Sequence, residues 1–201
     1  MNEREILVKE SSALKGKETD LEERSAKALY RHKRRRKELE RDIREIEEEI
    51  EELIKACPSI KENYDLLLSI PGIAFVNATA IIVATENFNK FTDASKYACH
   101  IGVAPFPHSS GTSVRGKTRT SFYGNKTLKA VITQAARSVV QYDVELKAYY
   151  ERKAGQGKEH GVIMNAIKYK LVARMFSIVR RKEMYLNSTD YKKDASYGHS
   201  T

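Results

Sequence analysis

The amino-acid sequence predicts a mainly α-helical protein. Apolar residues recur at spacings of three and four along most of the 201 residues, which is the period of a helix with one buried face. Side chains that cap helices precede several of these stretches, and proline or glycine separates them. We therefore expect an N-terminal coiled-coil helix, followed by a compact helical domain that contains a helix-hairpin-helix and one long polar loop.

The N-terminal region, residues 1–57, is polar and rich in Glu, Lys and Arg. Residues 1–20 show no apolar period and are expected to be disordered, whereas residues 21–57 are expected to form a coiled-coil helix. Its apolar residues follow the a/d pattern that needs a partner helix: Leu39, Ile43, Ile46, Ile50, Leu53 and Cys57. This seam predicts a homodimer or higher oligomer through residues 39–57, and an intramolecular hairpin would satisfy it equally well.

A run of basic residues, called the collar below, lies inside this helix. It is RHKRRRK, residues 31–37, with the cations Arg31, Lys33, Arg34, Arg35, Arg36 and Lys37. Seven consecutive helical residues point in all directions around the axis, so the collar forms no single face. It predicts either sequence-independent phosphate contacts or only a solvated stretch of helix.

Residues 59–185 are expected to form the helical domain. Pro58 ends the first helix, because proline lacks the backbone N–H of a helix interior. Helices are then predicted over residues 59–70, 73–85, 92–100, 127–141, 143–154 and 162–181, with a break at residues 155–157. The predicted N-terminal caps are Ser59 (with Glu62), Thr92 or Asp93, and Asp143. Residues 186–201 are expected to be a flexible tail.

The stretch LLLSIPGIAFVNATAII, residues 66–82, matches the helix-hairpin-helix pattern. Gly72 can adopt a positive φ, and the N–H groups that begin the second helix would then form a phosphate cradle at Pro71, Gly72, Ile73 and Ala74. Ala74 stands where the usual pattern has a second glycine. A tight helical hairpin that serves only the core is the alternative interpretation.

The polar loop PFPHSSGTSVRGKTRTSFYGN, residues 105–125, predicts phosphoryl-transfer chemistry. A serine hydroxyl becomes a nucleophile when a base takes its proton or when nearby groups stabilise the developing charge. Arg115, Lys117 and Arg119 occupy alternate positions, so they would share one side of an extended strand. We assign these cations to phosphate or transition-state contacts; phosphate binding without catalysis is the alternative.

The composition favours a nucleic-acid partner. Lys and Arg number 36 against 27 Asp and Glu, so the net charge is +9. The two cysteines and five histidines show no metal-ligand spacing, which argues against a zinc site. No stretch approaches the roughly 20 apolar residues of a membrane span, and the N-terminus is charged where a signal peptide is apolar. We expect a cytoplasmic protein, associated with the nucleoid if bacterial, without a membrane partner.

Six segments, in order, carry a resemblance to a known family. They are LLLSIPGI, FTDASKYACHIGVAP, HSSGTSVRGK, YGNKTLK, AYYERKAGQGK and NAIKYKLVARMFSIVRRKEMY. Together they resemble the C-terminal domain of the insertion-sequence-110 (Piv/MooV-like) transposases over residues 60–185. Residues 21–57 resemble the coiled-coil connector that precedes this domain in that family.

The resemblance implies a DNA recombinase with a serine nucleophile. The family's Ser-Gly motif begins at Ser110, so Ser110 is the candidate nucleophile and Ser109 is the alternative if the register slips. The Gly-Asn motif ends at Asn125. We expect Asn125 to cap the following helix or to contact a phosphate, and Lys129 to contact the nucleic-acid backbone nearby.

The resemblance also implies partners and a metal. DNA would be the substrate, and a structured guide RNA would pair with it. Family members begin with a RuvC-like domain whose carboxylates bind Mg²⁺; we expect that domain to be absent here, and no metal on this chain. The expected function is therefore a transposase module that is incomplete without the RuvC-like domain. A non-catalytic nucleic-acid-binding fragment and a coiled-coil interaction protein are the alternatives.

Overall fold

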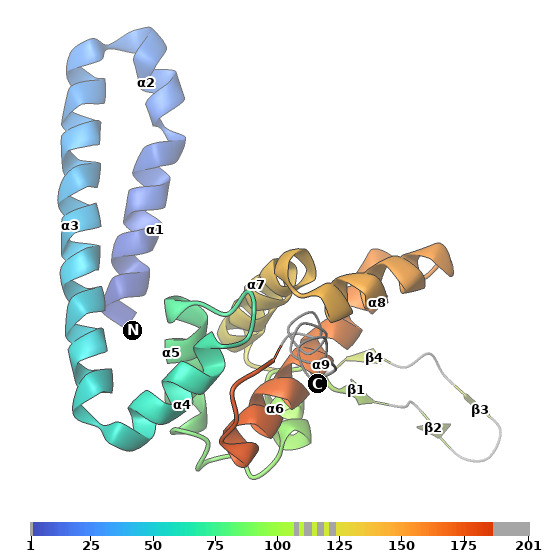
Figure 1. Cartoon of the computed structure of the whole chain (residues 1–201). Coiled ribbons are helices and arrows are strands. Elements are labelled where there is room, and N and C mark those ends of the chain that lie inside the picture. The colour runs from blue at the N-terminus through green and yellow to red at the C-terminus, as the bar shows by residue number, and fades with distance from the viewer. Residues whose placement is uncertain (1, 107–108, 111–113, 116–118, 121–123, 187–201) are drawn as a thin grey trace, which may run out of the picture. The chain divides into compact units, whose positions relative to one another are not determined.

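The structure is a computed structural model that describes residues 2–106, 109–110, 114–115, 119–120 and 124–186 (Figure 1). The predicted mainly α class is confirmed. The helices are α1 (Asn2–Gly16), α2 (Glu18–Arg24), α3 (Ala26–Ala56), α4 (Pro58–Leu68), α5 (Phe75–Thr85), α6 (Ala94–His100), α7 (Lys126–Tyr142), α8 (Val144–Gly155) and α9 (His160–Arg181). Short strands lie between α6 and α7: β1 (Pro105–Phe106), β2 (Ser109–Ser110), β3 (Val114–Arg115) and β4 (Arg119–Thr120).

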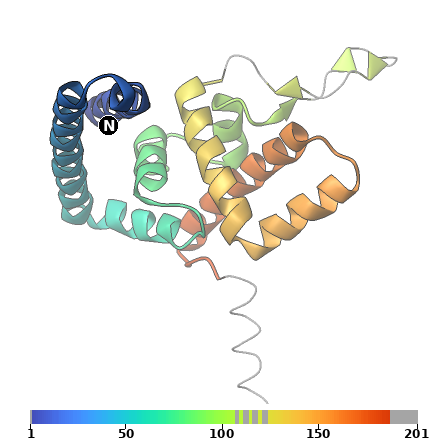
Figure 2. The same ribbon diagram turned by 90° about the horizontal axis from the view of Figure 1, so that it is seen from above.

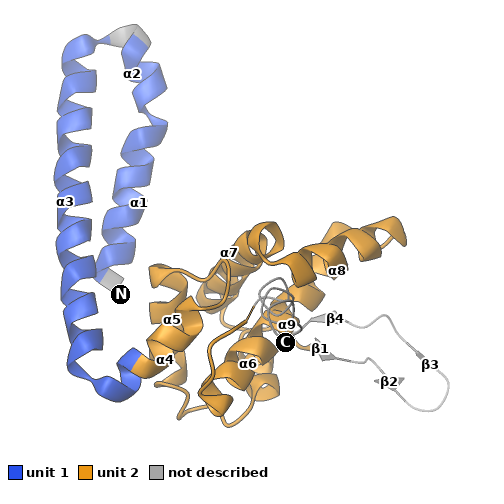
Figure 3. Ribbon diagram, viewed as in Figure 1, with its two compact units in different colours: residues 1–61 blue, residues 62–201 orange. Residues whose placement is uncertain are grey.

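The chain divides into two compact units, residues 1–61 and residues 62–201 (Figure 3). The first unit contains α1, α2, α3 and the beginning of α4. The second unit contains the rest of α4, the helices from α5 to α9, and the strands. This boundary falls close to the predicted one at Pro58.

In the first unit, α1 runs back along α3 (Figure 1). An ion pair joins the two helices at the start of α1, where the Arg4 guanidinium lies 2.6 Å from the Glu47 carboxylate. The residues predicted to be disordered, 1–20, are therefore helical for most of their length, and the structure corrects that expectation. The half-buried residues of α1 include Leu7 and Leu14 together with the ion-paired Arg4, so the apolar period of this helix is weak.

The predicted helix over residues 21–57 is interrupted at Ser25. Ser25 has extended backbone angles, and its Oγ accepts a hydrogen bond from Ala28 N at 3.4 Å, so it caps α3. In the predicted seam, Leu39 is fully buried, whereas Leu53 is 71% exposed and its neighbour Ile54 is buried instead. Because α1 lies along α3, the structure shows the intramolecular hairpin that the seam left open.

In the second unit, α7 packs against α5, α8 and α9, and α9 also packs against α6 and α8 (Figure 2). The largest fully buried side chains of this core include Tyr97, Leu67, Ile81, Ile132, Ile167, Leu171 and Met175. Asp93 caps α6 as predicted, because its Oδ1 accepts from Lys96 N at 2.9 Å. The predicted cap of Ser59 with Glu62 differs from the structure in two ways. The α4 helix begins at Pro58, one residue before Ser59, and the Glu62 carboxylate accepts from Lys182 Nζ at 2.6 Å.

Candidate nucleic-acid interface

Two short antiparallel ladders lie within the predicted polar loop. In one ladder Pro105 pairs with Thr120 and Phe106 with Arg119; in the other Ser109 pairs with Arg115 and Ser110 with Val114. These pairings bring the second half of the segment back along the first. We call residues 105–120 the serine arm.

Both candidate nucleophiles lie in β2 of this arm. Ser110 pairs with Val114 across a connection of residues 111–113, which lie outside the described residues. Ser109 pairs with Arg115, so the register sets a predicted phosphate-binding residue opposite the alternative nucleophile. The backbone register therefore sets the cationic residue opposite Ser109 and not opposite Ser110.

The three alternating cations of the arm do not form one described strand. Arg115 lies in β3 and Arg119 in β4, and these strands belong to different ladders. Lys117 lies outside the described residues. The described strands therefore leave untested the expectation that all three cations share one side of a single strand. Of the three, Arg115 lies in the strand that pairs with the serines of β2.

The segments on either side of the serine arm are held close together by a contact between Gly102 and Gly124. A Cβ on Gly124 would lie 2.5 Å from the backbone N of Gly102, which is closer than a real side chain tolerates. Gly102 itself has a φ of +68°. Next to this contact, Asn125 N donates a hydrogen bond to His100 O at 3.0 Å. The end of α6 and the start of α7 are thereby joined at the base of the arm.

Asparagine side chains from α7 and α9 complete the base of the arm. Asn125 caps α7, since its Oδ1 accepts from Leu128 N at 3.1 Å. Asn165 of α9 donates from Nδ2 to Val103 O at 3.1 Å, two residues before β1. Of the two roles expected for Asn125, the structure shows the cap. The arm therefore leaves the helical unit from fixed ends.

The proline–glycine hairpin has the predicted positive φ at Gly72, which is +86°. Gly72 lies against the backbone of α7, where a Cβ would approach Val139 N to 2.6 Å. Ile73 is buried, Pro71 is half-buried, and exposed Ala74 precedes α5 without a side-chain cap. The close contact with α7 favours a hairpin that serves the core, although Ala74 is exposed and Pro71 is only half-buried.

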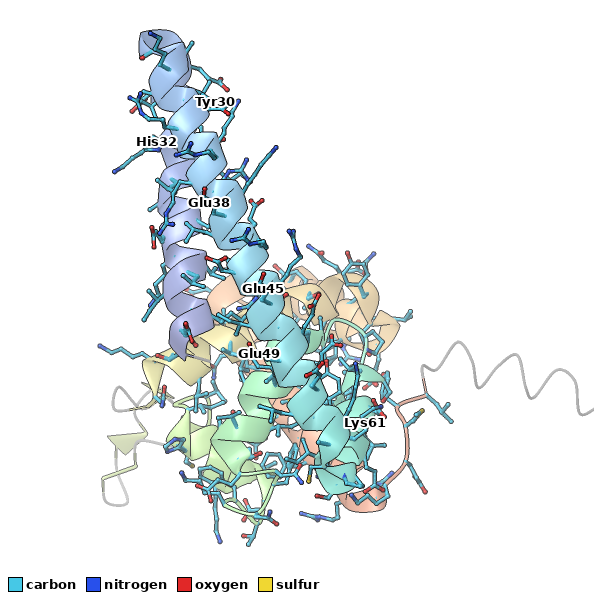
Figure 4. The ribbon with its side chains drawn as sticks, turned by 90° about the vertical axis from the view of Figure 1, so that its left-hand side faces the viewer. Tyr30, His32, Glu38, Glu45, Glu49 and Lys61 are labelled. Atoms are coloured by element: carbon cyan, nitrogen blue, oxygen red, sulfur yellow. The ribbon has the colours of Figure 1, made fainter. Side chains whose placement is uncertain are left out.

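Acidic side chains pair with four of the six cations of the collar, Lys33, Arg34, Arg35 and Arg36. Its ion pairs are Lys33 with Glu22 (3.5 Å), Arg34 with Glu38 (3.8 Å), Arg35 with Glu10 (3.4 Å) and with Glu38 (3.7 Å), and Arg36 with Glu18 (2.8 Å) and with Glu40 (2.5 Å). Figure 4 shows more acid beyond the collar, with Glu38, Glu45 and Glu49 along one side of α3. The acids of α1, α2 and α3 lower the positive potential that the collar presents to a polyanion.

A second group of cations lies between α7 and α9, and we call Lys129, Arg137 and Lys168 the α7–α9 cations. Of these only Lys129 is predicted from the sequence. Lys168 Nζ donates to Thr133 Oγ1 at 3.4 Å, and Thr133 Oγ1 donates to Lys129 O at 2.7 Å. Partial burial lowers the pKa of Lys168, and the positive charges of Lys129 and Arg137 lower it further. Neither α7 nor α9 contains an Asp or Glu.

A buried carboxylate lies at the junction of α7 and α8. Asp143 is fully buried; its Oδ1 caps α8 by accepting from Leu146 N at 2.8 Å, as predicted. Its Oδ2 accepts from Arg174 Nη1 and from the Tyr185 hydroxyl, each at 2.7 Å. Burial raises the pKa of Tyr185, and the hydrogen bond to Asp143 raises it further. Arg174 shows how a cation of α9 is held when a carboxylate is present.

The acids that the structure describes do not converge on a metal site. Within the residues described, no group of three or more His, Cys, Asp or Glu side chains could hold a metal ion. Mg²⁺ favours carboxylate oxygens, but carboxylates such as those of Glu18 and Glu47 here accept from arginines. The same part of the chain has no helix with the length and apolar character of a membrane span.

Comparisons with known proteins place the serine arm within a matched family segment. Residues 64–151 match the family model described as Transposase IS116/IS110/IS902 family. The insertion element IS110 uncharacterized 43.6 kDa protein of Streptomyces coelicolor is 28% identical over 142 residues. The pilin gene-inverting protein of Moraxella bovis is 28% identical over 145 residues. The transposase for insertion sequence element IS1111A of Coxiella burnetii is 25% identical over 143 residues.

These alignments cover 71%, 71% and 67% of this chain, in the same order. They cover only 34%, 45% and 38% of the relatives, so the chain spans less than half the length of each. The segment matched by the family model runs from α4 into α8. The resemblance predicted from the sequence is therefore confirmed: through residues 64–151, this chain matches the IS116/IS110/IS902 family of transposases.

Proposed function

We propose that this chain is a DNA transposase or recombinase module that acts by phosphoryl transfer through a serine. The observation that carries the proposal is the family match over residues 64–151, which includes the whole serine arm. Two relatives are named as a transposase and as a pilin gene-inverting protein. The basic composition, with a net charge of +9, also supports a nucleic-acid substrate.

In the proposed reaction, Ser110 Oγ attacks the phosphorus of a DNA phosphodiester. The bond from phosphorus to Ser110 forms as the bond to one deoxyribose oxygen breaks, so one phosphodiester replaces another. A base takes the serine proton, and the leaving deoxyribose oxygen takes up a proton. Attack by a DNA hydroxyl on the serine phosphodiester would reverse these steps and join the strand to a new end.

The predicted cations of the arm would assist this step. Charge on the phosphoryl oxygens would be stabilised by Arg115, Lys117 and Arg119, and fixed cations are most effective when water is excluded. Catalysis also needs the nucleophile to be positioned accurately, because a small displacement lowers the rate strongly. The hydrogen bonds at the base of the arm support such positioning. Ser109, the alternative nucleophile if the motif register slips, pairs with Arg115 in the ladder.

We also propose that a structured RNA, and not the protein, selects the DNA sequence. Contacts to phosphates position a nucleic acid but carry no sequence information, and the cations argued above are of that kind. RNA that copurifies with the chain should therefore be needed for sequence-selective binding. If the chain stripped of RNA by nuclease prefers the same DNA sequence as before, this part of the proposal is wrong.

A covalent-adduct assay tests the catalytic proposal. The full chain is incubated with suicide DNA, alone and with a RuvC-like domain and Mg²⁺ added, because the resemblance implies that such a domain completes the active site. We expect a protein–DNA adduct on denaturing gels that survives in Ser109→Ala and is lost in Ser110→Ala. These adjacent substitutions are matched controls, since each removes one hydroxyl from β2.

Three outcomes would contradict parts of this proposal. An adduct that persists in Ser110→Ala and disappears in Ser109→Ala would transfer the nucleophile to Ser109. An adduct that persists in both variants would exclude the serine mechanism. No adduct under any condition, from a chain that binds DNA, would leave the non-catalytic nucleic-acid-binding function.

A further inference from the structure

We infer that the α7–α9 cations form a binding site for the phosphodiester backbone of duplex DNA. The inference rests on the proposed function in one respect, since that function names DNA as the polyanion. The inference goes beyond the proposed function because it assigns a DNA-binding site outside the serine arm. Lys168 lies on α9, beyond the segment that the family model matches.

The side chains of this site come from two helices that pack together. Lys129, Thr133 and Arg137 follow one another at intervals of four residues, so they lie on the same side of α7. Lys168 extends from α9 to this side, because its Nζ donates to Thr133 Oγ1 at 3.4 Å. Thr133 thus holds the Lys168 ammonium beside the positive charges of α7.

The charges of this site lack a counter-ion from the protein. In the part of the chain that the structure describes, none of the three cations forms an ion pair with a carboxylate, whereas Arg174 on the same α9 pairs with Asp143 at 2.7 Å. Like charges held together near a partly buried lysine disfavour its protonated form. A bound polyanion would relieve this repulsion, so the arrangement is better suited to the DNA-bound state than to the free protein.

The spacing of the cations favours an extended polyanion over a small one. Eight residues separate Lys129 from Arg137, which corresponds to about 12 Å of helix. One strand of B-DNA carries a phosphate about every 3.4 Å along the helix axis. A single phosphate cannot bridge such a distance, whereas consecutive phosphates of a DNA strand can contact both ends of the site.

The site also adjoins the base of the serine arm. Lys129 N donates to Asn125 O at 2.9 Å, and Asn125 N donates to His100 O at the base of the arm. Lys168 follows Asn165 by three residues on α9, and Asn165 binds Val103 O, two residues before the arm begins. Duplex held by the α7–α9 cations would therefore lie next to the fixed ends from which the arm extends.

Binding of the full chain to duplex DNA of arbitrary sequence, measured between 50 and 200 mM salt, tests the inference. The variants are Lys168→Met and the combined Lys129→Met, Arg137→Met and Lys168→Met. The control is Lys90→Met, which removes an exposed lysine that pairs with Glu86 at 3.1 Å. We expect each lost contact to weaken binding about eightfold at 0.1 M salt and to reduce the logarithmic salt slope by about 0.9. Lys90→Met should bind like the unmodified chain.

Thermal melting of each variant without DNA checks that weaker binding does not reflect unfolding. Lys168→Met should melt no lower than the unmodified chain, because it removes a repelled charge and keeps a side chain of similar length. If the unmodified chain binds DNA and the triple variant binds like Lys90→Met, the site assignment is wrong while the proposed function stands. If the triple variant loses RNA binding and keeps duplex binding, the assignment to DNA is wrong. If the unmodified chain binds no DNA at any salt concentration, the proposed function fails as well.

Discussion

The collar of α3 and the α7–α9 cations are both basic, but they differ in their surroundings. Arg36 in the collar contacts Glu18 at 2.8 Å and Glu40 at 2.5 Å, so acids from two helices oppose its charge. Lys168 contacts Thr133, and its electrostatic neighbours are Lys129 and Arg137. The more conspicuous basic run in the sequence is therefore the better neutralised one.

The position of the carboxylates therefore decides which cations are available to a polyanion. The α3 helix contains acids from Glu38 onward, directly after the collar, whereas α7 and α9 contain none. Asp143 lies between these two helices in sequence and is directed to Arg174. Three situations result among the described residues: Arg174 pairs with a fully buried carboxylate, collar cations such as Arg36 pair with more exposed acids, and the α7–α9 cations have no carboxylate partner. Substitutions in each situation should change stability by different amounts and in different directions.

The largest effect is expected at Asp143, where a carboxylate that is 0% exposed pairs with Arg174, whose side chain is 14% exposed. Asp143→Ala should lower the free energy of unfolding by about 2–4 kcal/mol, since it removes the cap of α8 and the buried acceptor of Arg174 and of the Tyr185 hydroxyl, while Arg174 keeps its ion pair with Glu145 at 2.8 Å. Asp143→Asn, which keeps the capping oxygen and removes the charge, should lose less. Urea denaturation followed by circular dichroism measures both, and a loss below about 1 kcal/mol in Asp143→Ala would contradict the buried-pair interpretation.

A smaller change in stability, and a gain in DNA binding, are expected at Glu18. Glu18→Gln keeps a side chain that can accept from Arg36 but removes the negative charge beside the collar. The salt dependence of DNA binding should then become steeper, by up to about 0.9 in the logarithmic slope for one added phosphate contact. Arg36→Met combined with Glu18→Gln is the control, because it removes the released cation. An unchanged slope in Glu18→Gln would show that Glu18 does not restrain the collar.

The smallest effect, and the opposite sign, are expected for Lys168. Lys168→Met should raise the free energy of unfolding by about 0.5 kcal/mol at neutral pH, as other relieved surface repulsions do. The folded chain holds the pKa of Lys168 below its ordinary value of 10.5, so the unfolded state binds more protons between these two values. The penalty is complete below the folded pKa and decreases as the pH rises toward 10.5. The difference in melting temperature between the variant and the unmodified chain should shrink over the same range; a difference that grows there would contradict the cause assigned to the shift.

Much of the helical unit follows from local sequence signals. Asp93, Asn125 and Asp143 were identifiable as caps because a short polar side chain precedes an apolar helical stripe. The α1 helix was not identifiable in the same way. Its seam position Arg4 is polar and ion-paired with Glu47, which lies 43 residues later in the sequence. A pattern of apolar residues cannot reveal a seam in which long-range ion pairs replace part of the packing.

The candidate site was predictable only in part. The serine arm stood out through its composition, and Gly72 through its hairpin motif, although the contact of Gly72 with α7 depends on the tertiary fold. Arg137 and Lys168 were missed because isolated cations on amphipathic helices are common. The absence of Asp and Glu from residues 126–142 and 160–181 was a visible signal. Its meaning required the packing of α7 against α9.

Lysine acetylation footprinting of the unmodified full chain, with and without duplex DNA, compares the two basic regions most directly. Mass spectrometry would read the modification of Lys129 and Lys168 between α7 and α9, and of Lys33 and Lys37 in the collar. DNA should protect Lys129 and Lys168 strongly and leave the two collar lysines nearly as reactive as before. Protection of Lys33 and Lys37, with Lys129 and Lys168 unchanged, would contradict the assignment of DNA binding to the α7–α9 cations.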